Sequence, residues 1–202
     1  MKIKSISCKK CHAPLSVLGN SARSKNLICQ YCGTVMDVKN NFKALYTITQ
    51  VLQNDHLSIG TTIKHQNIKF TIAGYISYVS NGKYWISYQL FSTTHGYAQL
   101  IEKDKHFTLY RTTHYLPDKS LWMLKKGNNF TSNNQIFAIQ SFEIAEIYYA
   151  AGNLLQAIKQ GKRSKYCFAY CNKTKCWFYS EHQHNAVNYY VGVEFVPLKR
   201  QA

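Results

Sequence analysis

Residues 68–91 read IKFTIAGYISYVSNGKYWISYQLF, a pattern that indicates β structure. Apolar side chains recur at every second position on both sides of Asn81-Gly82, which is the period of a half-buried strand. Asn and Gly both accept positive φ angles, so this dipeptide between two alternating runs predicts a tight hairpin. Gly74 interrupts the first run, where we expect a bend or a bulge. One face of that run should carry Ile68, Phe70, Ile72, Ile76 and Tyr78.

Short apolar runs separated by turn residues continue along most of the remaining chain. This spacing predicts a mainly β fold with little helix, built as a small barrel or sandwich. We place a first β subdomain at residues 57–116, a connecting loop at 117–134 and a second β subdomain at 135–198. The strands expected in the second subdomain are 135–141, 144–150, 155–159, 165–171, 175–180 and 189–196.

Two Cys-x-x-Cys pairs precede the β region: Cys8-Lys9-Lys10-Cys11 and Cys29-Gln30-Tyr31-Cys32. Four thiolates at this spacing can reach the corners of a tetrahedron around Zn²⁺. Gly33 follows the second pair, where a knuckle turn favours positive φ. His12 follows the first pair, so we expect that knuckle to be less regular. We predict a zinc ribbon over residues 1–40 whose ligands are Cys8, Cys11, Cys29 and Cys32.

A disulfide framework is the alternative reading of these four cysteines. It is disfavoured because Met1-Lys2-Ile3-Lys4 lacks the apolar core of a secretory signal, and the reducing cytosol keeps thiols free for metal. No run approaches the roughly 20 apolar residues of a membrane-spanning helix. We therefore expect a cytoplasmic protein with a closed four-cysteine site, in which Zn²⁺ is structural and not catalytic.

Residues 41–56 should link the ribbon to the β region. Their apolar residues Leu45, Ile48, Val51 and Leu52 recur with a weak helical period. We expect either a short helix or an extended connector in this linker.

The chain has 25 Lys and Arg residues against 9 Asp and Glu residues, a formal charge of +16. This excess favours an anionic partner, which is an acidic protein, a nucleic acid or an anionic membrane surface. A lysine-rich background that keeps the protein soluble is the alternative explanation. Lysines outnumber arginines, which disfavours bidentate recognition of bases. The residues expected to contact anions are Lys9, Lys10, Arg23, Lys25, Lys162, Arg163 and Lys165.

Three segments together suggest a family: Ser58-Ile59-Gly60, residues 68–74, and Tyr84-Trp85-Ile86-Ser87-Tyr88. Their progression resembles the bacterial domain-of-unknown-function family numbered 4178, and the stretch Ala145–Gly161 is similar to the second half of that family. Some members carry an N-terminal zinc ribbon. The resemblance implies a bacterial protein in a membrane-stress context, because genes of the family often lie near those of phage-shock-type proteins. It implies no reaction, since the family has no established activity.

Residues suited to catalysis are few. The nine acidic residues offer little material for paired carboxylates, and no Gly-rich phosphate loop precedes a helix. The remaining candidate cluster consists of Cys167, Cys171 and Cys176 with His182 and His184. It is compatible with a second metal site or with the nucleophile and base of a cysteine-dependent enzyme. We expect instead that the three thiols are buried in the sheet and that both histidines lie in an exposed loop, since free Cys is among the most buried residue types.

The aromatic residues permit two interpretations. On a basic barrel they would suit base stacking, as in single-strand-binding proteins, yet Tyr and Phe also pack well across a pleated sheet. The residues in question are Tyr75, Tyr84, Trp85, Tyr97 and Tyr110. We predict a zinc-binding, non-enzymatic binding or adaptor protein with a basic surface. Nucleic-acid binding through the ribbon and the aromatic β surface is the main alternative.

Overall fold

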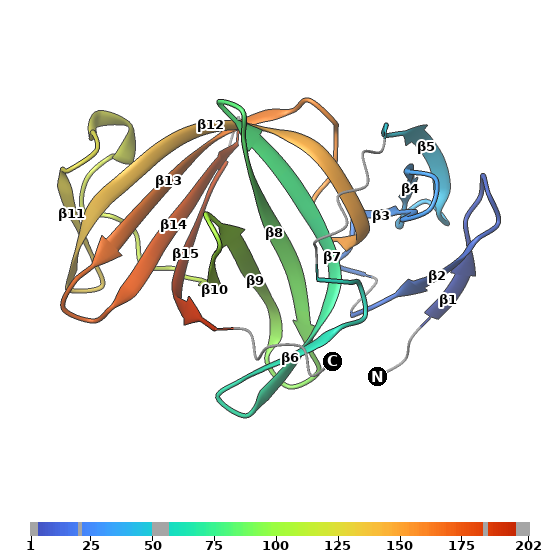
Figure 1. Ribbon diagram of the computed structural model, residues 1–202, viewed down its shortest axis with the longest axis horizontal. Helices are drawn as coiled ribbons and strands as arrows, with labels where there is room; N and C mark the ends of the chain where they lie inside the picture. Colours follow the sequence, from blue (N-terminus) through green and yellow to red (C-terminus); the bar gives the residue numbers. More distant parts are fainter. Residues whose placement is uncertain (1–3, 20–21, 50–56, 184–185, 197–202) are drawn as a thin grey trace.

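A computed structural model describes residues 4–19, 22–49, 57–183 and 186–196 (Figure 1). The predicted mainly β fold with little helix is confirmed. The N-terminal strands are β1 Lys4–Ser7, β2 Pro14–Val17, β3 Asn26–Ile28, β4 Thr34–Asp37 and β5 Lys43–Thr47. The strands that follow are β6 Thr62–His65, β7 Ile68–Ser80, β8 Lys83–Ser92, β9 Gly96–Lys103, β10 His106–Thr112, β11 Asn129–Ser132, β12 Gln135–Leu154, β13 Arg163–Cys171, β14 Cys176–Gln183 and β15 Ala186–Phe195.

The two predicted β subdomains belong to one closed ring of antiparallel strands. The ring runs β7-β8-β9-β10-β15-β14-β13-β12, and β12 then returns to pair with β7. The pair β10–β15 joins residues 57–116 to residues 135–198 within the same sheet. Of the two expected architectures, a small barrel and a sandwich, the protein therefore forms the barrel. Residues 117–134 do not separate two sheets; they carry the 3-10 turn η1 (Leu121–Met123) and β11 along one side of the barrel.

The Asn81-Gly82 hairpin forms as predicted, with Ser80 paired to Lys83. The predicted bulge is also present, between Ile72 and Gly74. Phe70 and Ile72 pack in a core on the outer face of β7–β10, whereas Ile76 and Tyr78 point into the barrel. The prediction that these residues share one face is wrong, because the extra residue of the bulge reverses the alternation.

Apolar side chains fill both the barrel and its outer faces. The interior contains large buried aromatic residues, namely Tyr78, Trp85, Tyr110, Tyr166 and Tyr179. An outer core on β12–β15 lies beneath η1 and β11 and includes Leu121, Phe130 and Phe178. Segment 117–134 therefore covers a sheet face that would otherwise expose apolar side chains to water.

Strand β12 connects the ribbon to the barrel. Its 20 residues pair successively with β11, β13, β7 and β3, and Figure 1 shows it arching across the molecule. The runs 135–141 and 144–150, expected as separate strands, both lie within it, with a bulge between Ile139 and Ser141. Residues 155–159, also expected as a strand, lie outside the strands.

Helical structure in the described part of the chain is limited to η1, and no helix there has the length and apolarity needed to cross a bilayer. Residues 41–56 were expected to hold a short helix or an extended connector. The extended alternative is correct for residues 43–47, which form β5 against β4. Val51 and Leu52, which suggested the helix, lie outside the described residues.

Candidate metal centre

The four N-terminal cysteines come from two turns, one between β1 and β2 and the other between β3 and β4. His12 N–H donates to the Cys8 carbonyl at 3.1 Å, and Gly33 N–H donates to the Cys29 carbonyl at 2.9 Å. The φ angles of His12 and Gly33 are 60° and 70°. The two knuckles therefore have the same geometry, and the expected irregularity at His12 is not found. Histidine is one of the residues that enter the left-handed region more readily than most.

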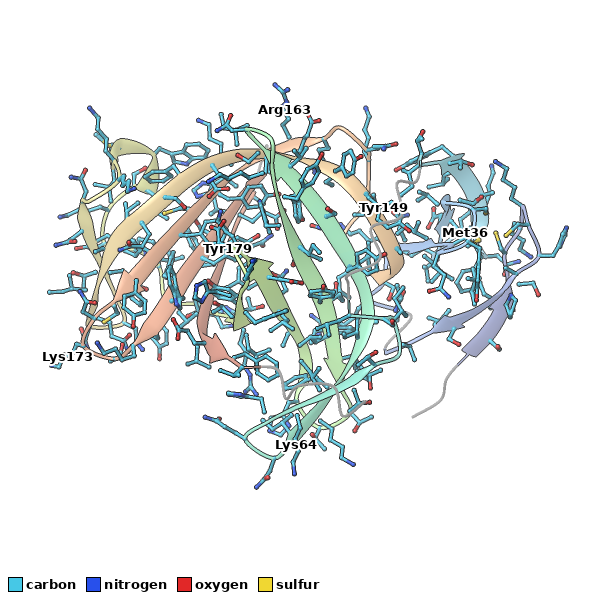
Figure 2. The ribbon with its side chains drawn as sticks, viewed as in Figure 1. Met36, Lys64, Tyr149, Arg163, Lys173 and Tyr179 are labelled. Atoms are coloured by element: carbon cyan, nitrogen blue, oxygen red, sulfur yellow. The ribbon has the colours of Figure 1, made fainter. Side chains whose placement is uncertain are left out.

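The spacing of the sulfur atoms fits a tetrahedral metal site. The Sγ atoms of Cys8 and Cys32 are 3.6 Å apart, those of Cys11 and Cys29 are 3.7 Å apart, and all four lie within 4.8 Å of one another. A tetrahedron with Zn–S bonds of about 2.3 Å has edges of about 3.8 Å. A disulfide needs about 2.05 Å, and all four cysteines are free thiols. The predicted ligands thus converge on a cluster that can hold a metal ion (yellow sulfur atoms beside Met36, Figure 2).

Hydrogen bonds and burial make the four thiols unequal. Burial raises the pKa of Cys29 to about 12. Burial also acts to raise the pKa of Cys32, but hydrogen bonds from the side chain and backbone of Thr34 outweigh it and lower the pKa to about 6. The Thr34 hydroxyl lies 3.1 Å from the Cys32 sulfur, and Lys10 N–H donates to Cys8 Sγ at 3.5 Å. A bound cation would favour the thiolate form of all four cysteines, including Cys29, whose thiolate is disfavoured by burial.

The second cysteine cluster does not converge. Cys167, Cys171 and Cys176 are buried, as expected, in the outer core of β12–β15. Cys171 faces Cys176 across the β13–β14 pair, whereas Cys167 faces Ser180. Burial raises the pKa of the Cys167 thiol to about 12. In the described residues the only group of three or more cysteine, histidine or acidic ligands within reach of one ion is the N-terminal one.

The histidines of that cluster were expected in an exposed loop. His182 is instead buried at the end of β14, where its Nε2 lies 2.8 Å from the Ser180 hydroxyl and its ring contacts Trp122. That part of the prediction is wrong, because β14 extends beyond the expected end at Ser180. His184 lies outside the described residues.

The predicted anion contacts do not form one patch. Lys9 and Lys10 are exposed on the first knuckle, whereas Arg23 and Lys25 are exposed just before β3. The remaining three residues, Lys162, Arg163 and Lys165, lie at the start of β13. Figure 2 shows Arg163 at the top of the molecule, well away from the sulfur atoms near Met36. Arg163 also binds Glu146 at 3.2 Å, which neutralises part of its charge.

The aromatic residues considered for base stacking mostly pack inside the protein. Trp85 and Tyr110 are each 2% exposed, Tyr75 and Tyr97 are half-buried, and Tyr84 remains exposed. Tyr78 stacks on Trp85 with ring centroids 4.2 Å apart, as aromatic residues do in a barrel core. The five residues therefore do not form a continuous stacking surface.

One exposed group was missed by the sequence analysis. Trp122, Met123, Phe142 and Ile144 are exposed, and Trp122, Phe142 and Ile144 line the same groove beside Lys165. The signal was weak, because Trp122 lies in a segment read as a loop, while Phe142 and Ile144 belong to a strand whose bulge hides their common face.

Comparison with protein-family models, with curated proteins and with solved structures gives no match for this chain. The resemblance to the family numbered 4178 stays a prediction, and function must be inferred from the geometry.

Proposed function

We propose that this chain is a zinc-binding, non-enzymatic binding protein, in which a structural metal fixes a ribbon against a basic β-barrel. The observation that carries the proposal is the convergence of the sulfur atoms of Cys8, Cys11, Cys29 and Cys32 within 4.8 Å. Four thiolates in a tetrahedron suit Zn²⁺ or iron, and a set without an open position suits a structural role. We favour Zn²⁺ because it accepts this geometry without any ligand-field preference.

The position of the site supports a structural role. The ribbon strand β3 pairs with β12, and Asn26 Oδ1 accepts a hydrogen bond from Ile158 N–H at 2.7 Å. Ile28, Val35 and Ile48 of the ribbon region pack into the same core as the barrel interior. A metal that orders the two knuckles would therefore also position β3 and β4 against the barrel.

Two features of the second cysteine cluster support a binding role over a cysteine-dependent reaction. A catalytic thiol needs a lowered pKa and access to its substrate. Cys167, whose pKa is raised, and Cys171, whose pKa is lowered, are both buried, and the nearby His182 contacts the Ser180 hydroxyl through its Nε2.

Nucleic-acid binding is a second proposal, now centred on the tips of the ribbon. Lys9, Lys10 and Tyr31 are exposed on the two knuckles, and Tyr31 is 58% exposed. Lysines could contact phosphates while the tyrosine stacks on a base. Binding of single-stranded oligonucleotides should then weaken steeply with salt, and replacing Lys9 and Lys10 by Glu should weaken it for all sequences alike. Binding that ignores salt, or none at low salt, would remove this second proposal.

Metal analysis of freshly purified, reduced protein tests the main proposal. We expect about one zinc and no iron per chain. Cys29→Ser should abolish the metal, whereas Cys167→Ser, which replaces an equally buried thiol outside the cluster, should retain it. Metal-free wild-type protein, or a metal that survives Cys29→Ser, would contradict the proposed site.

A further inference from the structure

The cover over the outer face of β12–β15 ends at Trp122. Two rows of residues cross this face: Ile144 pairs with Lys165, which pairs with His182, and Phe142 pairs with Cys167. The Trp122 ring lies edge-on to the buried His182 ring, with centroids 4.3 Å apart. Beyond Trp122 the described residues leave the same face open to solvent, and Phe142 and Ile144 are 39% and 57% exposed.

These residues form a groove of about 470 Å³ with a protruding apolar edge. The protrusion is η1, where Trp122 is 54% exposed and Met123 is 83% exposed. We call Trp122, Met123, Phe142 and Ile144 the apolar tip. Large apolar side chains at such exposure on adjacent elements are costly in water unless they serve an interaction.

The apolar tip is surrounded by positive charge. Lys125, Lys126 and Lys165 are exposed and line the groove. Lys165 Nζ lies 4.4 Å above the Trp122 ring, so the charge is held next to the indole. Among the described residues that line the groove, Glu143 is the acidic one, and Lys103 binds its carboxylate at 2.8 Å. The uncompensated charge of the groove is therefore positive.

We propose that the apolar tip and its three lysines dock the barrel on an anionic membrane surface. The arrangement matches the chemistry of the headgroup region: amphipathic Trp rings reside at that depth, and lysines just outside it attract acidic headgroups. Met123, the most exposed side chain of the apolar tip, projects from a short turn and does not line the groove, which suits insertion between lipids. The formal charge of +16 adds long-range attraction.

This inference names a partner for the proposed binding role but does not depend on the metal, because the apolar tip belongs to the barrel. The test is co-sedimentation of the full chain with vesicles of phosphatidylcholine alone and of phosphatidylcholine mixed with phosphatidylglycerol. We expect binding to the mixed vesicles that weakens with salt, together with a blue shift of tryptophan fluorescence. Of the three tryptophans, Trp85 is buried and Trp177 is half-buried against the barrel core, so the exposed Trp122 should dominate that shift.

Matched variants distinguish a site from general charge. Lys125→Glu with Lys126→Glu should weaken vesicle binding at least about tenfold, whereas Lys9→Glu with Lys10→Glu, the same charge change on the ribbon, should change it little. Trp122→Ala should weaken binding about tenfold, and Leu45→Ala, an exposed apolar residue of β5, should not. Met123→Ser provides a further variant at a side chain that contributes almost nothing to packing, in case Trp122→Ala fails to fold.

Equal weakening by both double-lysine variants would overturn the proposal, because charge alone would then explain the binding. Binding to poly-glutamate that is lost in Trp122→Ala, without any vesicle binding, would also overturn it and indicate an acidic protein partner. Zinc content measured in the same preparations keeps the two proposals separate. Zinc-loaded protein that ignores the mixed vesicles would overturn the membrane proposal alone.

Discussion

Gly74 of β7 and Gly152 of β12 pair directly where the barrel closes, and neither position has room for a Cβ atom. A Cβ on Gly152 would lie 2.5 Å from the Ala73 carbonyl oxygen, and one on Gly74 would lie 2.7 Å from the Ala151 carbonyl oxygen. Gly152 also has a φ angle of 80°, which side-chain-bearing residues rarely adopt. Closure of the ring thus depends on two glycines that are distant in sequence.

Gly152→Ala should lower the free energy of unfolding by about 3 kcal/mol or more, because backbone atoms must move to admit the methyl group. Gly161→Ala is the matched control: its φ angle is 75°, but a Cβ there meets nothing within 4 Å. The free energy of unfolding of that variant should fall by only about 1 kcal/mol, the cost of placing a residue with a side chain in a left-handed conformation. Denaturant titration of both variants gives the comparison, and equal losses would mean that the close approach of β7 and β12 is unimportant.

Removing the metal should destabilise more than the ribbon. Because Ile28, Val35 and Ile48 pack in the core of the barrel, we expect chelation to lower the free energy of unfolding of the whole chain by at least about 3 kcal/mol. Denaturant unfolding with and without chelator measures this loss, and hydrogen exchange should show faster exchange where β3 pairs with β12. Re-addition of Zn²⁺ should restore both. Identical unfolding curves would show that the cysteine cluster contributes no stability.

His182 should make stability depend on pH. Burial, helped by the nearby positive charge of Lys165, lowers the pKa of His182 to about 4, whereas an unfolded histidine titrates near 6.5. Between these values the unfolded chain binds more protons than the folded chain, so stability falls as the pH decreases from about 6.5 to about 4, by at most about 3 kcal/mol. His182→Gln removes the titrating group, so the stability of wild type relative to this variant should fall across the same window. A constant difference would contradict the lowered pKa.

Two of the three cysteines outside the N-terminal cluster, Cys171 and Cys167, should react slowly and in a defined order. Although burial acts to raise the pKa of Cys171, hydrogen bonds from Thr174 and the backbone N–H of Lys173 lower it overall. Burial raises that of Cys167 to about 12. Pulse labelling of native, metal-loaded protein, followed by peptide mapping, should modify Cys171 before Cys167, and both more slowly than in denatured protein. Early modification of Cys167 would show that the outer core is open at that point.

The parts of the fold that were predictable depend on residues close together in sequence. Asn81-Gly82 specifies its hairpin locally, and the spacing within each Cys-x-x-Cys pair predicts the two knuckles that carry the four cysteines. The position of Gly74 indicated a bulge, but not that the bulge would divide β7 between two cores. A single added residue exchanges the two faces of a strand, and the sequence pattern alone does not show on which side of the bulge each partner strand lies.

The parts that were missed depend on partners far apart in the chain. The pairing of β12 with β7 joins residues about seventy positions apart, and β12 itself was read as separate strands because its bulge breaks the alternation. The apolar tip was missed for a related reason. The bulge between Ile139 and Ser141 places Phe142 and Ile144 on the same face as Lys165. The turn η1 reaches that face because residues 117–134 fold back over it.

The length of β12 has a mechanical consequence. Because this strand pairs with β3 at one end and with β11 at the other, a pull on the ribbon is transmitted along one continuous backbone into the opposite end of the barrel. If the apolar tip anchors the barrel to a surface while the ribbon is held by another molecule, β12 is the element that resists the tension between them.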